Sequence, residues 1–380
     1  MAGTLRVGMV GYAFMGAAHA HAWRTAPRFF ELPLRPELTA VCGRSPAELR
    51  AAADRQGWAG TETDWKRLVA RDDIDLIDIC TPGDSHAEIA LAALAAGKHV
   101  LCEKPLANTL AEAEAMTAAA RQARAAHGAR AAVGFNYRRV PAISLARQLV
   151  AEGRLGRIRH VRAQYLQDWL VDPEAPLTWR LRAERAGSGS LGDLGAHAVD
   201  LAQFLTGEPI TGVSAVLETF VAERPDPAGG RRPVTVDDAA AFTARFGGGA
   251  LGVFEATRFA TGRKNALRIE VDGELGALVF DLESLNELGF HDRTESSRTA
   301  GFRRVLATEP EHPYAAAWWP AGHVLGYEHT FTHQVKDLVE AIAAGADPTP
   351  SFAEGLRVQR VLDAVAASAR TASVWTAVTD

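Results

Sequence analysis

The chain has 380 residues, of which 47% are hydrophobic and 23% charged, and its formal net charge is −5. This balance is typical of a soluble protein with two globular domains. The charges form no basic patch, which argues against a nucleic-acid partner. No uncharged apolar run of about 18 residues is present, so no membrane span is predicted.

The three cysteines indicate a reducing compartment. Cys42, Cys80 and Cys102 each end a short apolar run, and their odd, low number makes no disulfide framework. Their spacing matches no zinc pattern, so no metal is expected. The apolar start is interrupted by Arg6 and lacks the features of a secretory signal. We therefore expect a cytoplasmic protein.

Up to residue 134, short apolar runs alternate with amphipathic segments. We expect strands at Leu5–Val10, Leu38–Cys42, Leu76–Cys80, His99–Cys102 and Ala131–Gly134, and helices at Met15–Thr25, Pro46–Gln56, Ser85–Ala96 and Thr109–His127. The strands are apolar almost throughout, as are parallel strands covered on both faces. This alternation predicts a doubly wound α/β domain over residues 1–134.

From residue 135 onward the pattern changes. We expect helices at Ala142–Glu152 and Phe352–Ser373, a strand at Leu267–Asp272, hairpin turns at Phe246–Ala250 and Asp272–Gly276, and a surface loop at Arg224–Pro233. The strand alternates apolar and polar residues, which is typical of an antiparallel sheet with one wet face. Residues 135–380 are therefore predicted to form a second α/β domain.

The first predicted strand runs into a dinucleotide-binding fingerprint with one change. Gly11 suits the tight turn and Gly16 the close packing of helix on strand, but Ala13 replaces the middle glycine. Phe14 and Met15 begin the following helix, whose free N–H groups suit a pyrophosphate. The motif predicts a nicotinamide nucleotide here.

The end of the second strand bears on the choice between NAD and NADP. A carboxylate that would hold the ribose 2′-hydroxyl of NAD is absent, and Arg44 and Ser45 stand there instead. Arg44 suits a 2′-phosphate, which favours NADP, although a solvated arginine beside a helix start would look the same. Both cofactors stay open.

Two further clusters carry chemical groups. Glu103, Lys104 and the pair Thr81-Pro82 follow predicted parallel strands, at the edge where such sheets bind ligands. The glycine-rich segment Gly187–Asp200 leads into a helix that contains Asp193 and His197, four residues apart on one face.

These groups together suit the oxidation of an alcohol. His197 is the candidate base, Lys104 can hold the hydroxyl oxygen, and Asp193 can orient the imidazole or bind a neighbouring hydroxyl.

In this order the motifs resemble the glucose–fructose oxidoreductase and inositol dehydrogenase (Gfo/Idh/MocA) family. The resemblance is carried by Gly11–Gly16 with His19, Thr81-Pro82, Gly97–Val100, Glu103–Pro105, Gly189–His197 and Pro350–Leu356. It implies a Rossmann domain followed by a domain with a large open, mostly antiparallel sheet, which often forms the interface of a homodimer or homotetramer. It also implies Lys104, Asp193 and His197 as the catalytic residues. The implied cofactor-binding residues are Gly11, Ala13, Phe14, Met15, Gly16, Arg44, Ser45, Thr81, Pro82, His86, Glu103, Lys104 and Asn136.

Within the family, the chain is most similar to a subgroup that oxidises the C3 hydroxyl of the 1,6-anhydro sugar levoglucosan. The segments that match are Phe135–Arg139, Tyr165–Trp169, Trp179-Arg180 and Ala186–Gly189. The implied substrate-binding residues are Lys104, Tyr137, Tyr165, Gln167, Trp169, Arg180, Asp193 and His197. Aromatic faces and amides suit a sugar, although Trp169 and Trp179 would also suit a protein core.

The resemblance leaves other functions open. An inositol dehydrogenase would use the same chemistry on a cyclitol. A sugar- or nucleotide-sensing regulator of the family is the alternative without catalysis, and the complete set of Lys104, Asp193 and His197 argues against it.

Overall fold

The computed structural model describes residues 3–379, which divide into two compact units. The first unit holds the chain up to Arg139 together with Gly326–Leu356, and the second holds Val140–Leu325 and the chain from Arg357 onward. The predicted boundary, after residue 134, lies a few residues before the observed one, which follows Arg139. The difference arises because the 3₁₀ turn η2 (Asn136–Arg139) packs against a helix of the first unit.

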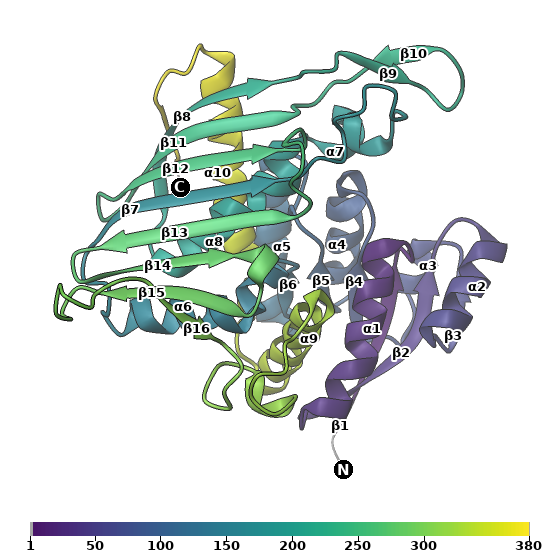
Figure 1. Ribbon diagram of the computed structural model, residues 1–380. Helices are drawn as coiled ribbons and strands as arrows, with labels where there is room; N and C mark the ends of the chain where they lie inside the picture. The colour runs from purple at the N-terminus through teal and green to yellow at the C-terminus, as the bar shows by residue number, and fades with distance from the viewer. Residues whose placement is uncertain (1–2, 380) are drawn as a thin grey trace. The chain divides into compact units, whose positions relative to one another are not determined.

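The first unit is built on a six-stranded sheet whose paired strands are all parallel (Figure 1). The strands are β1 (Gly3–Val10), β2 (Leu34–Cys42), β3 (Gly60–Glu62), β4 (Leu76–Ile79), β5 (His99–Cys102) and β6 (Ala131–Val133). Their order, β3-β2-β1-β4-β5-β6, confirms the predicted doubly wound fold. Strand β3 was not predicted, because three residues carry too little pattern.

The helices of this sheet begin and end at local signals. They are α1 (Phe14–Phe29), α2 (Pro46–Gln56), α3 (Trp65–Val69), η1 (Gly83–Ser85), α4 (His86–Ala95) and α5 (Leu110–His127). Thr109 and Glu112 form a capping box at the start of α5, and Gly57 and Gly128 end α2 and α5 in left-handed conformation. Helix α1 continues past its predicted end at Thr25, with Pro27 in its last turn.

A helix from late in the chain completes the first unit. Helix α9 (Tyr327–Ala344), which the sequence pattern did not predict, lies beside α1 (Figure 1). Phe331, Val335 and Leu338 of α9 belong to the same buried cluster as Trp23 of α1. The first unit therefore takes part of its core from residues three hundred positions away from its first strand.

The second unit is built on a nine-stranded sheet (Figure 1). Its order is β16-β15-β14-β13-β7-β12-β11-β8-β17, and the strands are β7 (Ile158–Leu166), β8 (Ile210–Glu218), β11 (Ala239–Phe246), β12 (Leu251–Thr257), β13 (Ala266–Gly273), β14 (Gly276–Asp281), β15 (Glu287–Asp292), β16 (Arg303–Leu306) and β17 (Thr376–Ala377). Only the β7–β12 pair is parallel among the pairs of this sheet in residues 3–379. The predicted large, mostly antiparallel sheet is confirmed, as are the turns at Phe246–Ala250 and Asp272–Gly276.

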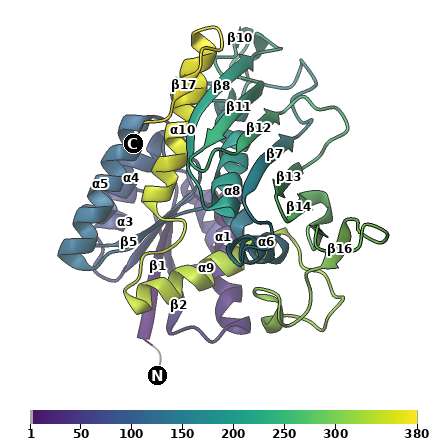
Figure 2. The ribbon, with the colours of Figure 1, turned by 90° about the vertical axis from the view of Figure 1, so that its left-hand side faces the viewer.

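Helices cover one face of this sheet (Figure 2). The helical segments are α6 (Pro141–Ala151), η3 (Trp179–Leu181), α7 (Ala183–Ala186), a π-helical turn η4 (Leu191–Gly195), α8 (Ala196–Thr206), η5 (Leu282–Ser284), η6 (Ala315–Ala317) and α10 (Phe352–Arg370). Helix α8 packs on β7 and β13, and Ser368 of α10 accepts a hydrogen bond from the backbone of Ala215 in β8. On β7 and β11 buried residues alternate with exposed ones, so the face of the sheet that the helices do not cover is exposed to solvent and is called the wet face below.

The prediction of a surface loop at Arg224–Pro233 is wrong. Strands β9 (Glu223–Pro225) and β10 (Arg231–Pro233) pair there as a short antiparallel ribbon. Arg224 is fully buried and donates to the carbonyl oxygens of Leu170 and Asp172, each at 2.6 Å. The composition indicated turns correctly, but no local signal showed that this arginine binds backbone more than fifty residues away.

Two further expectations concern single features. Cys42, Cys80 and Cys102 are buried free cysteines, as predicted. No helix within residues 3–379 is long and apolar enough to span a membrane.

Candidate active site

The fingerprint segment lies where the order of the first sheet reverses. Strands β1 and β4 are neighbours, yet the chain leaves them toward opposite sides of the sheet. In open parallel sheets, ligands bind at the carboxyl ends of such strands. Gly11 directly follows β1, Thr81 lies two residues after β4, and Phe14, at the start of α1, is 67% exposed.

The geometry explains the two glycines of the fingerprint. Gly11 has φ +102°, and a Cβ there would lie 2.7 Å from the carbonyl oxygen of Cys80. A Cβ on Gly16 would lie 2.2 Å from the carbonyl oxygen of Gly11, so helix and strand meet only with glycine. Ala13 is exposed at the N-cap of α1, where its methyl group meets no such limit. The segment fits a dinucleotide, whose pyrophosphate would lie at the start of α1.

His86, a predicted cofactor contact, lies between two segments of this edge. It is buried, with Nδ1 3.0 Å from the carbonyl oxygen of Pro105 and Nε2 2.9 Å from that of Thr81. Both ring nitrogens are thus occupied by backbone. His86 therefore holds together the two segments that carry Thr81-Pro82 and Lys104.

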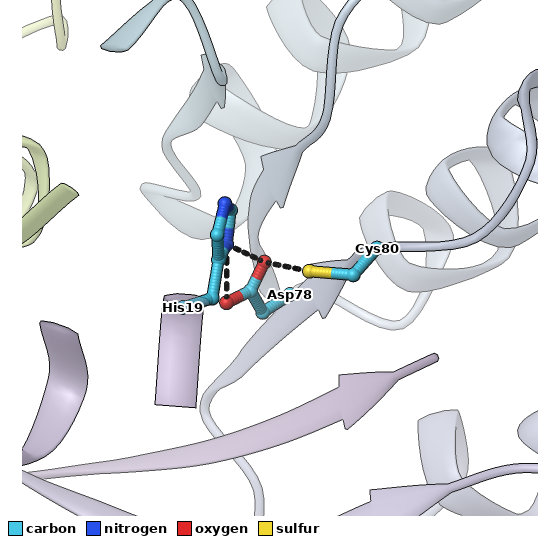
Figure 3. Close-up of side chains that lie close together, drawn as sticks. All are labelled: His19, Asp78 and Cys80. Carbon is cyan, nitrogen blue, oxygen red and sulfur yellow. Dashed lines mark hydrogen bonds and ion pairs between the residues drawn. The ribbon is translucent and has the colours of Figure 1, made fainter. Parts of the chain in front are cut away.

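A buried ionic cluster lies beneath the same edge of the sheet. His19 of α1 directs Nδ1 at both carboxylate oxygens of Asp78, each at 3.0 Å, and Nε2 at Oε1 of Glu103, also at 3.0 Å (Figure 3 shows the Asp78 side). Trp23 Nε1 donates to Asp78 at 2.7 Å. His19, Asp78 and Glu103 are all at least 95% buried. Glu103 therefore anchors the segment of Lys104.

The cluster resembles a metal site in composition and spacing, but its hydrogen bonds indicate a different role. Atoms of His19, Asp78 and Cys80 lie within 4.8 Å of one another (Figure 3). Carboxylate oxygens only accept hydrogen bonds, so each ring nitrogen of His19 must carry a proton. An imidazolium has no lone pair for a metal ion. Burial raises the pKa of Cys80, which keeps the thiol neutral.

We expect His19→Gln to destabilise the protein by about 3 kcal/mol, because it leaves two buried carboxylates without their shared cation. Burial lowers the pKa of His19, but the carboxylate of Asp78 and its hydrogen bond raise it well above the usual value. The stabilisation is therefore complete below the unfolded-state pKa of about 6.5 and is lost as the pH rises through the folded-state pKa. Urea denaturation at several pH values measures both effects. His21→Gln, on the same helix but only half-buried, is the control.

Asn136 and Tyr137 lie in η2, directly after the last strand of the first unit. Asn136 is buried and donates through Nδ2 to Thr330 Oγ1 of α9 at 2.8 Å. The ring of Tyr137 lies 6.3 Å from that of Tyr327, also in α9. Helix α9 thus positions both predicted site residues, which no local pattern indicated.

In the second unit, the predicted sugar-binding residues form one connected group at the end of β7. Trp169 Nε1 donates to Gln167 Oε1 at 2.8 Å, and the ring of Tyr165 meets that of His197 edge-on, with centroids 5.9 Å apart. Trp169 is 42% exposed and so is not a core residue, whereas Trp179 is half-buried beneath the guanidinium of Arg180. The group presents aromatic faces and amides together.

The glycine-rich segment is fixed in place. A Cβ on Gly189 would lie 1.7 Å from the carbonyl oxygen of Asp237. The carboxylate of Asp237 accepts from the backbone of Gly189 and Leu191 and from Ser190 Oγ, each at 2.7 Å. The glycine therefore allows close approach of the chain's own backbone. The π-helical turn that follows carries Asp193, a feature frequent at functional sites.

Arg258, which sequence reasoning missed, lies beneath this group. It is 99% buried and donates through Nη2 to Asp193 Oδ2 and to the carbonyl oxygen of Gly189, both at 3.0 Å. Its guanidinium also lies 5.3 Å from the ring of Trp169. Because Asp193 and Arg258 are far apart in sequence, only the folded sheet reveals the pair. Arg258 therefore holds the side chain of Asp193 in a fixed position.

The predicted residues thus form two groups, one in each unit. At the carboxyl edge of the first sheet lie Gly11, Ala13, Phe14, Met15, Gly16, Arg44, Ser45, Thr81, Pro82, His86, Glu103, Lys104, Asn136 and Tyr137. At the end of β7 in the second unit lie Tyr165, Gln167 and Trp169, with Arg180 in η3, Asp193 in η4 and His197 in α8.

Comparison with known proteins identifies both units. Residues 5–130 match the "Oxidoreductase family, NAD-binding Rossmann fold", and residues 143–279 match the "GFO/IDH/MocA C-terminal domain". The chain is 41% identical to levoglucosan dehydrogenase of Pseudarthrobacter phenanthrenivorans, with 96% of each protein covered.

Solved structures agree with this similarity. A crystal structure of an oxidoreductase domain protein from Kribbella flavida has a TM-score of 0.97 and 67% identity over all of both chains. A structure of levoglucosan dehydrogenase in complex with NADH and levoglucosan has a TM-score of 0.95 and 41% identity, with 99% of each chain covered.

Proposed function

Because the chain belongs to the GFO/IDH/MocA family of NAD-binding oxidoreductases, we propose that it oxidises a secondary hydroxyl of a sugar, with C3 of levoglucosan or of a related glucoside as the first candidate. The observation that carries the proposal is the group at the end of β7. There Tyr165, Gln167 and Trp169 present aromatic and amide surfaces, and the Tyr165 ring touches His197. Such surfaces match the C–H faces and hydroxyl rim of a sugar.

The chemistry assigns a role to each reacting residue. When bound, the nicotinamide accepts the hydride from the carbon that bears the hydroxyl. His197 takes the hydroxyl proton, for which an imidazole is suited near neutral pH. The ammonium of Lys104 holds the hydroxyl oxygen and stabilises the developing alkoxide. Asp193, fixed by Arg258, accepts a hydrogen bond from a neighbouring hydroxyl or orients the imidazole.

Turnover assays test the proposal. The purified protein is incubated with NAD or NADP and with levoglucosan, methyl glucosides, glucose or myo-inositol, and the absorbance of reduced nicotinamide is followed. We expect the highest kcat/KM with levoglucosan or a glucoside. Preference for myo-inositol would favour a cyclitol dehydrogenase, and no turnover with any of these compounds would contradict the proposal.

We propose that Arg44 lets the site accept NADP as well as NAD. The side chain is exposed directly after β2, and Ser45 follows at the N-cap of α2. We expect Arg44→Ala to raise KM for NADP about tenfold, the loss of one charge-assisted contact to a phosphate, and to leave KM for NAD within about twofold. Steady-state kinetics with both cofactors measure this. Arg50→Ala, which removes an exposed arginine of the following helix α2, is the control, and equal losses for both cofactors would remove the assignment.

We also propose that copies of the chain associate through the wet face of the nine-stranded sheet. Val216 and Val253 are 61% and 42% exposed there, and Ala241 of β11 pairs with Val216 of the neighbouring strand. Clustered exposed apolar residues on a sheet face mark interaction surfaces. Light scattering should give the mass of a dimer or tetramer, and the mass of one chain would contradict this.

A further inference from the structure

A polar residue outside the predicted set lies beside the sugar-binding group. Asn265 directly precedes β13, next to the end of β7, because Ala266 pairs with Leu166 in the sheet. Its Oδ1 accepts two hydrogen bonds of 2.7 Å, one from the Tyr165 hydroxyl and one from Gln167 Nε2. Asn265 is therefore the point at which these two side chains meet.

The indole of Trp169 fixes which atom donates in the hydrogen bonds that join Trp169, Gln167 and Asn265. The Nε1 of Trp169 can only donate, so the oxygen of the Gln167 amide must face it, at 2.8 Å. The amide nitrogen of Gln167 then donates to Oδ1 of Asn265. The hydrogen bonds to Tyr165 and Gln167 therefore use only Oδ1 of Asn265 and leave its Nδ2 group out.

This Nδ2 group keeps its two donors for an outside partner. Within residues 3–379, both side-chain hydrogen bonds of Asn265 use Oδ1. The residue is only half-buried, so the NH2 group is not sealed in the protein. Through Oδ1 the residue is joined to Tyr165, whose ring lies against His197, and through Gln167 to Trp169, which is 42% exposed.

We propose that Asn265 is a specificity-determining residue, whose Nδ2 donates a hydrogen bond to a sugar oxygen other than the one that is oxidised. Its Oδ1 meanwhile holds Tyr165 and Gln167 in the orientation that receives the sugar. The inference rests on the proposed function and adds a donor to it. A site built to pair with a substrate oxygen discriminates against analogues that lack that oxygen, because the buried donor is then left without a partner.

Two variants separate the two ends of the amide. Asn265→Asp keeps an oxygen to accept from Tyr165 and Gln167 but replaces the outward donor with an acceptor, so we expect KM for levoglucosan to rise at least about tenfold with a smaller change in kcat. Asn265→Ala removes both ends and should lower kcat as well. Gln148→Glu makes the same change from amide to carboxylate on an exposed part of α6 and should change KM less than about twofold.

Deoxy substrates identify the partner oxygen. For the wild-type enzyme, we expect kcat/KM to be about tenfold lower with one of the two analogues, 2-deoxy- or 4-deoxy-levoglucosan, than with levoglucosan. For the Asn265→Ala variant, we expect kcat/KM to be the same with that analogue as with levoglucosan. NADH binding and the melting temperature show that each variant is folded. If wild-type enzyme turns over levoglucosan while both variants keep its KM and its discrimination, the inference is overturned and the proposed function stands. If the wild-type enzyme oxidises none of the sugars, glucosides or cyclitols, the proposed function fails and this inference with it.

Discussion

Replacing His197 with alanine is expected to lower kcat by about 10²- to 10⁴-fold, the range for the loss of a general base. The residue is 95% buried in the first turns of α8, and its ring is held edge-on by Tyr165. Since neither residue belongs to the unit that carries the fingerprint, the affinity for NADH should stay nearly unchanged. Stopped-flow or steady-state kinetics give kcat, and fluorescence titration gives the NADH affinity.

The pH profile distinguishes a base from a packing residue. The wild-type enzyme should show a pH-dependent limb of kcat/KM that is absent in His197→Ala. His323→Ala, which removes an exposed histidine of the same unit, should leave kcat and the profile unchanged. Unaltered turnover near neutral pH in His197→Ala would show that another group takes the proton.

Replacing Lys104 with alanine should lower kcat by about 10²- to 10³-fold, the typical cost of removing one group that stabilises a developing oxyanion. Lys104 follows Glu103, whose carboxylate is fixed by His19, so the lysine backbone is rigidly placed at the sheet edge. Lys104→Arg should not restore activity, because a planar guanidinium cannot replace a compact ammonium at one oxygen atom.

The measurement is kcat and KM with the best substrate for both Lys104 variants. Lys66→Ala, at an exposed lysine of the same unit, is the matched control and should behave like the wild type. If Lys104→Ala raised KM but kept kcat, the lysine would bind substrate equally in ground and transition states and would not be catalytic.

The sheet of the first unit could be predicted because its signals are local. Apolar runs, the capping box at Thr109 and the glycine at 128 lie within the elements that they define. Helix α9 shows the limit of such signals. Its amphipathic face is complementary to Trp23 and its neighbours on α1, and that match is between segments about three hundred residues apart. A helical pattern at Tyr327–Ala344 would not have shown which unit it joins.

The candidate site shows the same contrast between local signals and contacts over long sequence distances. Residues at strand ends and in motifs, such as Lys104 and His197, were predictable from position alone. Arg258 and Asp237 were not, because each contacts the glycine-rich segment from far away in the sequence, Asp237 from just before β11 and Arg258 from directly after β12. The sequence shows that Gly189 lacks a side chain but not that the carbonyl oxygen of Asp237 would lie 1.7 Å from a Cβ there.

The return of Gly326–Leu356 to the first unit affects how the chain folds during synthesis. When the ribosome has made residues through Arg139, the six strands are complete, but the apolar side of α1 that receives Phe331 and Val335 is still open to water. All of Val140–Leu325 must emerge before that surface is closed, so the nascent chain exposes it for an extended period, when it is open to aggregation or to chaperones. For the same reason, a fragment that stops at Arg139 would lack part of its own core, and the nucleotide-binding half of this enzyme is not an independent module.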